Sequence, residues 1–235
     1  MLLDIFTADN IWLALLSVII AFPALLFSLS LHEFAHGYAA YTQGDTYAKS
    51  TGRLTLNPFK HLDPIGTLAM LLVGFGWAKP VTVVPSNFRN GRKSMLIVAF
   101  AGIFANLVLA TVAYFFMYFF QYIISDKIIW FYTSDTGFMC YTIIYMILYY
   151  LVVLNISLAV FNLMPIPPLD GYNIFKELFI GRINYRFFAS VERYSTYILI
   201  AFLVLGDRIG IISSISEFIF DLLKKVMDLI FIAFI

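Results

Sequence analysis

The sequence has few charged side chains and a single cysteine. Only 12% of the 235 residues are charged, 62% are apolar and the mean hydropathy is +0.89, whereas about 25% of the residues of a soluble domain are charged. Cys140 has no second cysteine to pair with, so an intramolecular disulfide is excluded. With a net charge of +1 and no basic, aromatic-rich pattern, we expect no nucleic-acid partner. The composition therefore predicts a membrane protein.

Three long runs of the chain contain no charged residue. They cover residues 11–31, 94–125 and 136–169, and each is longer than the about 20 residues that cross a hydrocarbon core. A fourth span is predicted at about 190–206. Residues 211–235 form either a last span or an interfacial helix, because five charged residues interrupt them. We expect an all-α polytopic membrane protein with about four to six membrane segments.

The region between the first two runs has a different pattern. One helix is predicted from Ile11 to about Thr42, with Gly44 placed where a helix would stop. The stretch LDPIG, residues 62–66, opens a short apolar piece that ends near Gly76 and suits a re-entrant element. The following WAKPVTVVP, residues 77–85, alternates and is rich in β-branched residues, which predicts a strand or hairpin. We therefore expect a small re-entrant or β-hairpin element near 64–90.

The distribution of lysine and arginine predicts the orientation in the membrane. Seven such residues lie between the first run and residue 94, and four lie between 163 and 193, whereas residues 122–136 contain only Lys127. Basic loops face the cytoplasm. We therefore expect a multi-pass protein whose N-terminus lies outside and whose first helix ends at the cytoplasmic side.

The first predicted helix carries the sequence HEFAH on its last turns. His32 and His36 are four residues apart, so their imidazoles share one helix face and can bind one divalent metal. Glu33 points to the neighbouring side, where it can act as a base towards water without occupying a coordination site. The chain has only three histidines, which makes a chance pairing at this spacing a poor explanation.

A catalytic zinc site needs a third protein ligand and an open position for water. The candidate is Asp170 in FNLMPIPPLDG, residues 161–171, where prolines interrupt the chain directly after an apolar run. On the residues alone, a carboxylate at this position could instead cap a helix that begins near Gly171. The sequence leaves these two roles open.

Five separated blocks resemble one known family. They are HEFAH, GRLTLNPFKHLDPIGTL (52–68), FGWAKPV (75–81), AGIFAN (101–106) and FNLMPIPPLDG. In this order they are similar to the blocks of the site-2 protease family, the intramembrane zinc metalloproteases. The chain resembles the compact members, with no PDZ domain between its spans and no CBS domain after them.

The resemblance implies a role for individual residues. It makes His32, His36 and Asp170 the ligands of one Zn²⁺ per chain and Glu33 the general base. It assigns Asn106 and Asn162 to ordering the site or the substrate. It further implies one metalloprotease domain over residues 1–235, with a catalytic core at about 10–180 and C-terminal membrane segments at about 190–235.

These residues predict a protease that cuts transmembrane substrates from the cytoplasmic side of the bilayer. Lys79, Pro80 and Val81 are candidates for binding the substrate or ordering the site, because Pro80 would place a strand edge where an extended substrate segment could pair. A hairpin that only braces the spans is the alternative. The alternative function is a metal-ion or proton transporter that uses the same buried His, Glu and Asp side chains. The oligomeric state does not follow from the sequence.

Overall fold

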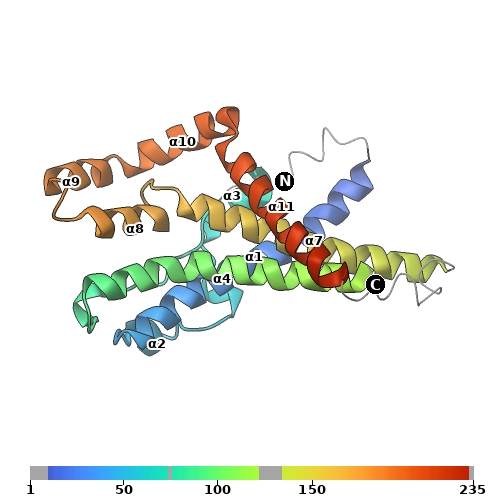
Figure 1. Cartoon of the computed structure of the whole chain (residues 1–235), viewed down its shortest axis with the longest axis horizontal. Helices are drawn as coiled ribbons and strands as arrows, with labels where there is room; N and C mark the ends of the chain where they lie inside the picture. Colours follow the sequence, from blue (N-terminus) through green and yellow to red (C-terminus); the bar gives the residue numbers. More distant parts are fainter. Residues whose placement is uncertain (1–9, 74–75, 122–133, 233–235) are drawn as a thin grey trace.

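Three long helices form the centre of the molecule. The computed structural model describes residues 10–73, 76–121 and 134–232. The three helices are α1 (Ile11–Thr42), α4 (Arg92–Phe119) and α7 (Asp135–Leu163), and α1 crosses the pair formed by α4 and α7 (Figure 1). All three are long and apolar enough to cross a membrane. The spans predicted from the charge-free runs are confirmed.

Small residues allow these helices to approach closely. Ala110 and Ala113 of α4 are almost fully buried and pack with Val152 and Ile156 of α7 in the main hydrophobic cluster. In a membrane, helix association depends on such close packing because lipid tails are as apolar as the side chains themselves. The bundle is therefore held together near its centre by shape complementarity.

Four helices follow the central bundle. They are α8 (Asp170–Phe179), α9 (Tyr185–Arg193), α10 (Ser195–Ile209) and α11 (Ile211–Ile232). The span predicted at about 190–206 is a bent pair, Tyr185–Arg193 and Ser195–Leu205, with an angle of 68° between its two parts. The described residues thus contain three candidate spans, or up to four if the bent pair is one span. This is slightly fewer than the four to six segments expected from the sequence.

Helix α11 is not among the candidate spans. Its charged residues interrupt the apolar sequence, as expected. Met227 and Phe231 nevertheless pack into the cluster formed by α4 and α7, and Tyr118 of α4 donates a hydrogen bond to Asp228 at 2.8 Å. Figure 1 shows α11 running obliquely across α7. The C-terminal helix therefore braces the side of the bundle.

The connection between α1 and α4 contains only short elements: α2 (Tyr47–Ser50), the 3₁₀ turns η2 (Pro58–Lys60) and η3 (Pro85–Asn87), and α3 (Pro64–Val73). Its 10 residues make α3 only about 15 Å long, which is too short for a span. The predicted strand at 77–85 is wrong. Among the described residues, only one antiparallel bridge, Leu62 to Ala78, pairs this segment with another.

The missing strand has a physical reason. The amide of Val81 donates to Glu33 and the amide of Val84 donates to Asp45, each at 2.7 Å, and Pro80 has no amide hydrogen to donate. The segment is extended, but these two amides bind side chains of the α1 region instead of a neighbouring strand.

Helix α1 ends as the sequence predicts. Gly44 has a φ of +110°, in the left-handed region that favours glycine at a helix C-terminus. The next residue, Asp45, is buried and accepts hydrogen bonds from the amides of Tyr47 and Val84 and from the Asn87 side chain. Burial acts to raise the pKa of Asp45, but these hydrogen bonds hold the pKa below its usual value. An ionised carboxylate therefore fixes residues 84–87 against the end of α1.

Some expectations fall outside the described residues. The start of the chain and most of the loop at 122–136, including Lys127, belong to this part. The predicted orientation in the membrane remains a prediction, as do the domain boundaries.

Candidate metal centre

Three side chains converge inside the bundle where α1 meets the start of α8. His32 and His36 are buried on one face of α1, as their spacing predicts. Their Nε2 atoms lie 3.0 Å apart, and each lies 3.1 Å from Oδ2 of Asp170. Ligand atoms at ordinary zinc distances in a tetrahedral site are about 3.3 Å apart. The three residues therefore fit a zinc ion, and among the described residues they form the one His, Cys, Asp or Glu cluster of this kind.

The second nitrogen of each imidazole is also fixed. His32 Nδ1 lies 2.6 Å from Oδ1 of Asn106, and His36 Nδ1 lies 2.7 Å from the carbonyl oxygen of Val98, both on α4. Because an amide or carbonyl oxygen can only accept, both histidines carry their proton on Nδ1. The Nε2 lone pairs are then directed towards the common point, which is the arrangement that metal-binding histidines need.

A buried polar network joins the site to all three central helices. The Asn106 side chain donates to Asn155 Oδ1 on α7 at 2.6 Å, and Asn155 donates to Ser28 Oγ on α1 at 2.7 Å. Ser28 lies one helical turn before His32, so the network returns to the helix on which it began. Asn106 and Asn155 tie the helices together, and Asn106 orders His32 directly.

Gly102 of α4 faces the two histidines. A Cβ atom at this position would overlap Nε2 of His36 and would lie only 2.7 Å from Nε2 of His32. Any side chain would therefore occupy the point at which the ligand atoms converge. The absence of a side chain leaves this space available.

Asp170 reaches the histidines because α7 ends shortly before it. Helix α7 stops at Leu163, and α8 begins at Asp170 with Leu169 as its N-cap residue, so Asp170 itself is not the cap. Gly171 packs so closely that an added Cβ would overlap the carbonyl groups of Leu163 and Met164. Oδ2 of the Asp170 carboxylate lies 3.1 Å from Nε2 of both histidines, which favours the ligand role over the capping role.

The environment keeps the Asp170 carboxylate ionised. Burial acts to raise its pKa, but hydrogen bonds from Nε2 of His32 and His36, which form when these imidazoles are protonated, hold the pKa well below its ordinary value. An ionised carboxylate beside two imidazole lone pairs is a donor set that suits a divalent cation.

Glu33 contacts the segment that was expected to form a strand edge. Its Oε2 atom accepts the hydrogen bond of the Val81 amide at 2.7 Å. The Val81 side chain is buried and lies against Gly37, where an added Cβ would be 3.3 Å from Val81 Cγ1. Residues 79–81 are thus seated on the face of α1 that carries Glu33.

The remaining predicted residues lie in different places. Lys79 and Pro80 are exposed, and their carbonyl groups accept hydrogen bonds from Arg53. Asn162 is half-buried and donates to the carbonyl of Leu158 in its own helix; the described hydrogen bonds do not link it to the cluster. His61, the third histidine of the chain, is buried, and its Nε2 bonds to the carbonyl of Thr55 and not to the cluster.

The site residues predicted from the sequence do not include Ser28, Arg53, Val98 or Gly102. For two of these positions, the spacing in the sequence indicates a place in the site. Ser28 precedes His32 by four residues and Gly102 precedes Asn106 by four, so each lies on the same helix face as a predicted site residue. Val98 contributes a backbone carbonyl, which no side-chain pattern can indicate.

Comparison with known proteins gives a consistent result. The model of Peptidase family M50 matches residues 20–206. The chain is 39% identical over 181 residues to the “Putative zinc metalloprotease YwhC” of Bacillus subtilis, a match that covers 77% of each chain. It is 31% identical over 159 residues to the “Putative zinc metalloprotease Rip2” of Mycolicibacterium smegmatis, covering 66% of this chain and 55% of that relative. No solved structure matches the chain.

These matches decide between the two predicted functions. They are to zinc metalloproteases and give no support to a metal-ion or proton transporter. With three to four candidate spans among its described residues, the chain is an integral membrane protein. It belongs to Peptidase family M50, the site-2 protease family of zinc-dependent intramembrane peptidases.

Proposed function

We propose that this chain is a zinc metalloendopeptidase that binds one Zn²⁺ and hydrolyses a peptide bond in or next to a transmembrane helix of its substrate. The observation that carries the proposal is the convergence of His32, His36 and Asp170 to within 3.1 Å of one another, beside Glu33. We further propose that residues 1–235 act as one domain, with the catalytic core at about 10–180.

The proposed ligands provide three protein donors, which leaves one position for water or substrate, as in other catalytic zinc sites. A bound zinc ion supplies Lewis acidity, which lowers the pKa of water towards about 7 and polarises the scissile carbonyl. Asn106 and the Val98 carbonyl hold the imidazoles in the tautomer that can bind the metal.

Glu33 is the proposed general base. It removes a proton from the attacking water and then delivers a proton to the leaving amine. The Val81 amide donates to Oε2 of Glu33, so Oε1 can face the water while the carboxylate is held in a fixed rotamer. Val81 is therefore proposed to order the site, as are Asn106 and the backbone of Lys79 and Pro80.

The substrate must change conformation before it is cut. The backbone amides of a transmembrane helix are all hydrogen-bonded within the helix, so local unwinding has to expose the scissile bond. Asn162 stays a candidate for contacting the unwound segment, on the resemblance alone.

We propose that the site is reached from the cytoplasm and that the N-terminus lies outside. The basic residues of the connection between α1 and α4 support this orientation. A cysteine placed at the exposed Ser50 should react with a membrane-impermeant thiol reagent only after the cytoplasmic side is opened. If the cysteine at position 50 were labelled in intact cells, the orientation would be the reverse of the proposed one.

The Glu33→Gln variant tests the proposed mechanism. It removes the base but leaves the three ligands, so zinc content should stay near one per chain. Cleavage should fall by about 10²- to 10⁴-fold, the usual contribution of a general base. The assay is co-expression with a panel of single-span membrane proteins, scored for fragments that disappear in the variant, with metal content measured on purified protein.

His36→Ala is the matched control, because it removes a ligand and should lose both zinc and cleavage. Cleavage at the parental rate by Glu33→Gln would rule out the proposed mechanism.

A further inference from the structure

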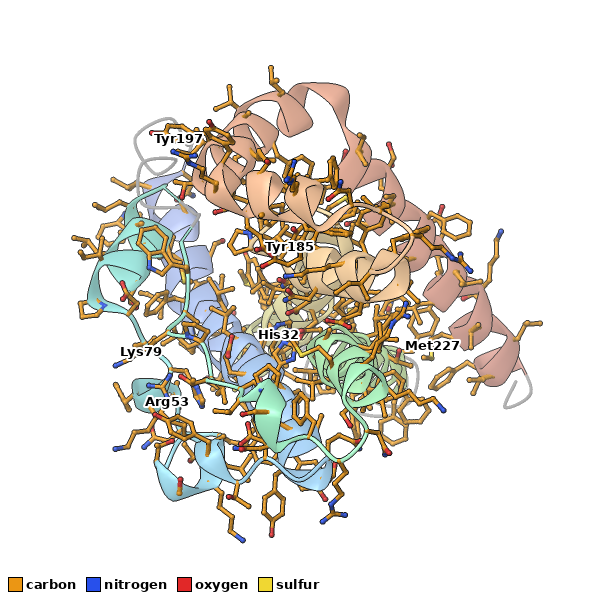
Figure 2. All side chains as sticks on the ribbon, turned by 90° about the vertical axis from the view of Figure 1, so that its left-hand side faces the viewer. His32, Arg53, Lys79, Tyr185, Tyr197 and Met227 are labelled. Carbon is orange, nitrogen blue, oxygen red and sulfur yellow. The ribbon has the colours of Figure 1, made fainter. Side chains whose placement is uncertain are left out.

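The side chain of Arg53 holds two successive carbonyl groups. Its Nη2 atom donates to the carbonyl oxygen of Lys79 at 2.8 Å and to that of Pro80 at 3.1 Å. Figure 2 shows Arg53 and Lys79 on the same side of the molecule, with His32 in its interior. Nε of Arg53 is buried and has no hydrogen-bond partner among the described residues. The guanidinium is therefore docked onto this segment and is not simply a solvated surface charge.

The Pro80 carbonyl and the Val81 amide belong to the same peptide group. The Pro80–Val81 peptide is trans, so its C=O and N–H point in opposite directions. Arg53 binds the oxygen of this peptide and Glu33 binds its N–H, at 2.7 Å. One planar peptide group thus stands between a guanidinium and a carboxylate.

Both of these hydrogen bonds involve a charged partner. Charge-assisted hydrogen bonds are shorter and stronger than neutral ones, and hydrogen bonds in series polarise one another. Donation to the Pro80 oxygen makes the Val81 N–H a better donor to Glu33. Arg53 and Glu33 are thereby linked through one peptide group without direct contact between the two side chains.

Further contacts make the arrangement rigid. The Lys79 amide donates to the carbonyl of His61 at 2.7 Å, and the Val81 side chain is buried against α1. The Lys79 and Pro80 carbonyls and the Val81 amide are therefore already used within the chain. Residues 79–81 are better suited to fix Glu33 than to pair with a substrate strand.

We propose that Arg53 is a positioning residue for Glu33 and acts through the Pro80–Val81 peptide. The inference rests on the proposed role of Glu33 as the base. It gives Arg53 a function beyond its contribution to membrane orientation. Arg53 contacts neither the metal ligands nor the proposed reacting atoms, so its loss should affect the rate of hydrolysis and spare the zinc.

The test compares Arg53→Met, Arg53→Lys and Lys60→Met in the full-length protein reconstituted in lipid. Lys60 is an exposed cation of the same connection and is the matched control. Four quantities are measured: zinc per chain, kcat, KM for a cleaved transmembrane substrate, and hydrogen–deuterium exchange of the amides at 79–84.

Arg53→Met should keep its zinc and its KM, lose about 10- to 100-fold in kcat, and exchange the Val81 amide faster. Arg53→Lys should recover part of the rate, because an ammonium keeps the charge but lacks the planar donor geometry of the guanidinium. Lys60→Met should match the parent. Glu33→Ala, which removes the acceptor, should speed exchange of the Val81 amide at least as much as Arg53→Met.

The proposal is overturned if Arg53→Met keeps the parental kcat, if it loses zinc, or if Lys60→Met is equally slow. Unchanged exchange of the Val81 amide in Glu33→Ala would also overturn it. Glu33→Gln, assayed in parallel, separates the two levels of inference. If that variant is inactive while Arg53→Met is fully active, only the role of Arg53 fails; if Glu33→Gln cleaves normally, the proposed mechanism fails.

Discussion

The proposed metal ligands and the proposed base on α1 are held by different parts of the molecule. His32 and His36 are fixed from within the bundle, by Asn106 and the Val98 carbonyl of α4. Glu33, between them in sequence, is fixed by the amide of Val81 in the connection between α1 and α4. The proposed ligands therefore depend on helix packing, whereas the proposed base depends on an extended segment outside the three central helices.

The difference indicates which damage should affect which property. Changes at the interface of α1 with α4 should weaken metal binding first, and cleavage should fall as a consequence. Changes in residues 79–81 or their anchors should slow cleavage while the zinc remains bound. Metal content and turnover rate, measured on the same variants, can therefore separate the two regions.

The strongest test of the metal site within the helix bundle removes one of the proposed ligands. His32→Ala, His36→Ala and Asp170→Ala should each lower zinc affinity by more than about 100-fold, since losing even an outer-shell partner costs 10- to 100-fold. Cleavage should be lost in parallel. Competition with a chelator measures the affinity, and Lys60→Met serves as the control.

Asp170 is the informative member of this set, because it comes from the start of α8 and not from α1. If Asp170→Ala bound zinc as tightly as the parent, the carboxylate would only bridge the two histidines and another group would complete the site.

Much of the fold and the site follows from the sequence, for physical reasons. A span needs a long charge-free run, so composition alone located α1, α4 and α7. The spacing of His32 and His36 placed both on one helix face, because the helical repeat is fixed. The position of Asp170 beside them could be assigned only through the family resemblance, since the two motifs are 134 residues apart.

The error at 77–85 is equally instructive. The alternating β-branched residues at 77–85 predict an extended backbone, and the backbone there is extended. A strand, however, also requires a neighbouring strand with which to pair. Here the partners of the Val81 and Val84 amides are the carboxylates of Glu33 and Asp45. Hydrogen bonds between a backbone and distant side chains leave no periodic signal, and for the same reason the contacts of Arg53 could not be predicted.

A smaller effect on the metal site within the helix bundle is expected from adding one methyl group at Gly102. Alanine normally stabilises a helix relative to glycine, by about 1 kcal/mol. Here the new Cβ would overlap the imidazoles of His32 and His36, and overpacking of this kind costs about 1–3 kcal/mol. We expect Gly102→Ala to weaken zinc binding by roughly 10- to 100-fold and to lower the unfolding temperature of the zinc-free protein only slightly, because the gain in helix propensity offsets part of the overpacking.

The control for Gly102→Ala is Phe104→Leu, on the exposed side of the same helix, which should leave zinc affinity unchanged. Parental zinc affinity in Gly102→Ala would show that the histidines can move away from α4 and that the close contact does not shape the site.

The smallest effect is expected for the network behind His32, and here two asparagines provide a matched pair. Asn106→Ala removes the acceptor of His32 Nδ1 and leaves a buried donor without a partner, which frees the ring to change tautomer or rotate. Zinc affinity should fall by about tenfold, the lower end of the range for outer-shell partners. Asn162→Ala deletes the same type of side chain at a position that bonds only to the Leu158 carbonyl among the described contacts, so its zinc affinity should equal that of the parent. The measurement is the same chelator competition, followed by kcat at saturating zinc, where Asn106→Ala should regain most of its activity because the ligands themselves are intact. Equal zinc affinities for the two variants would mean that packing alone orders His32. The proposed difference between a metal site fixed by the three central helices and a base fixed by residues 79–81 would then lose its main support.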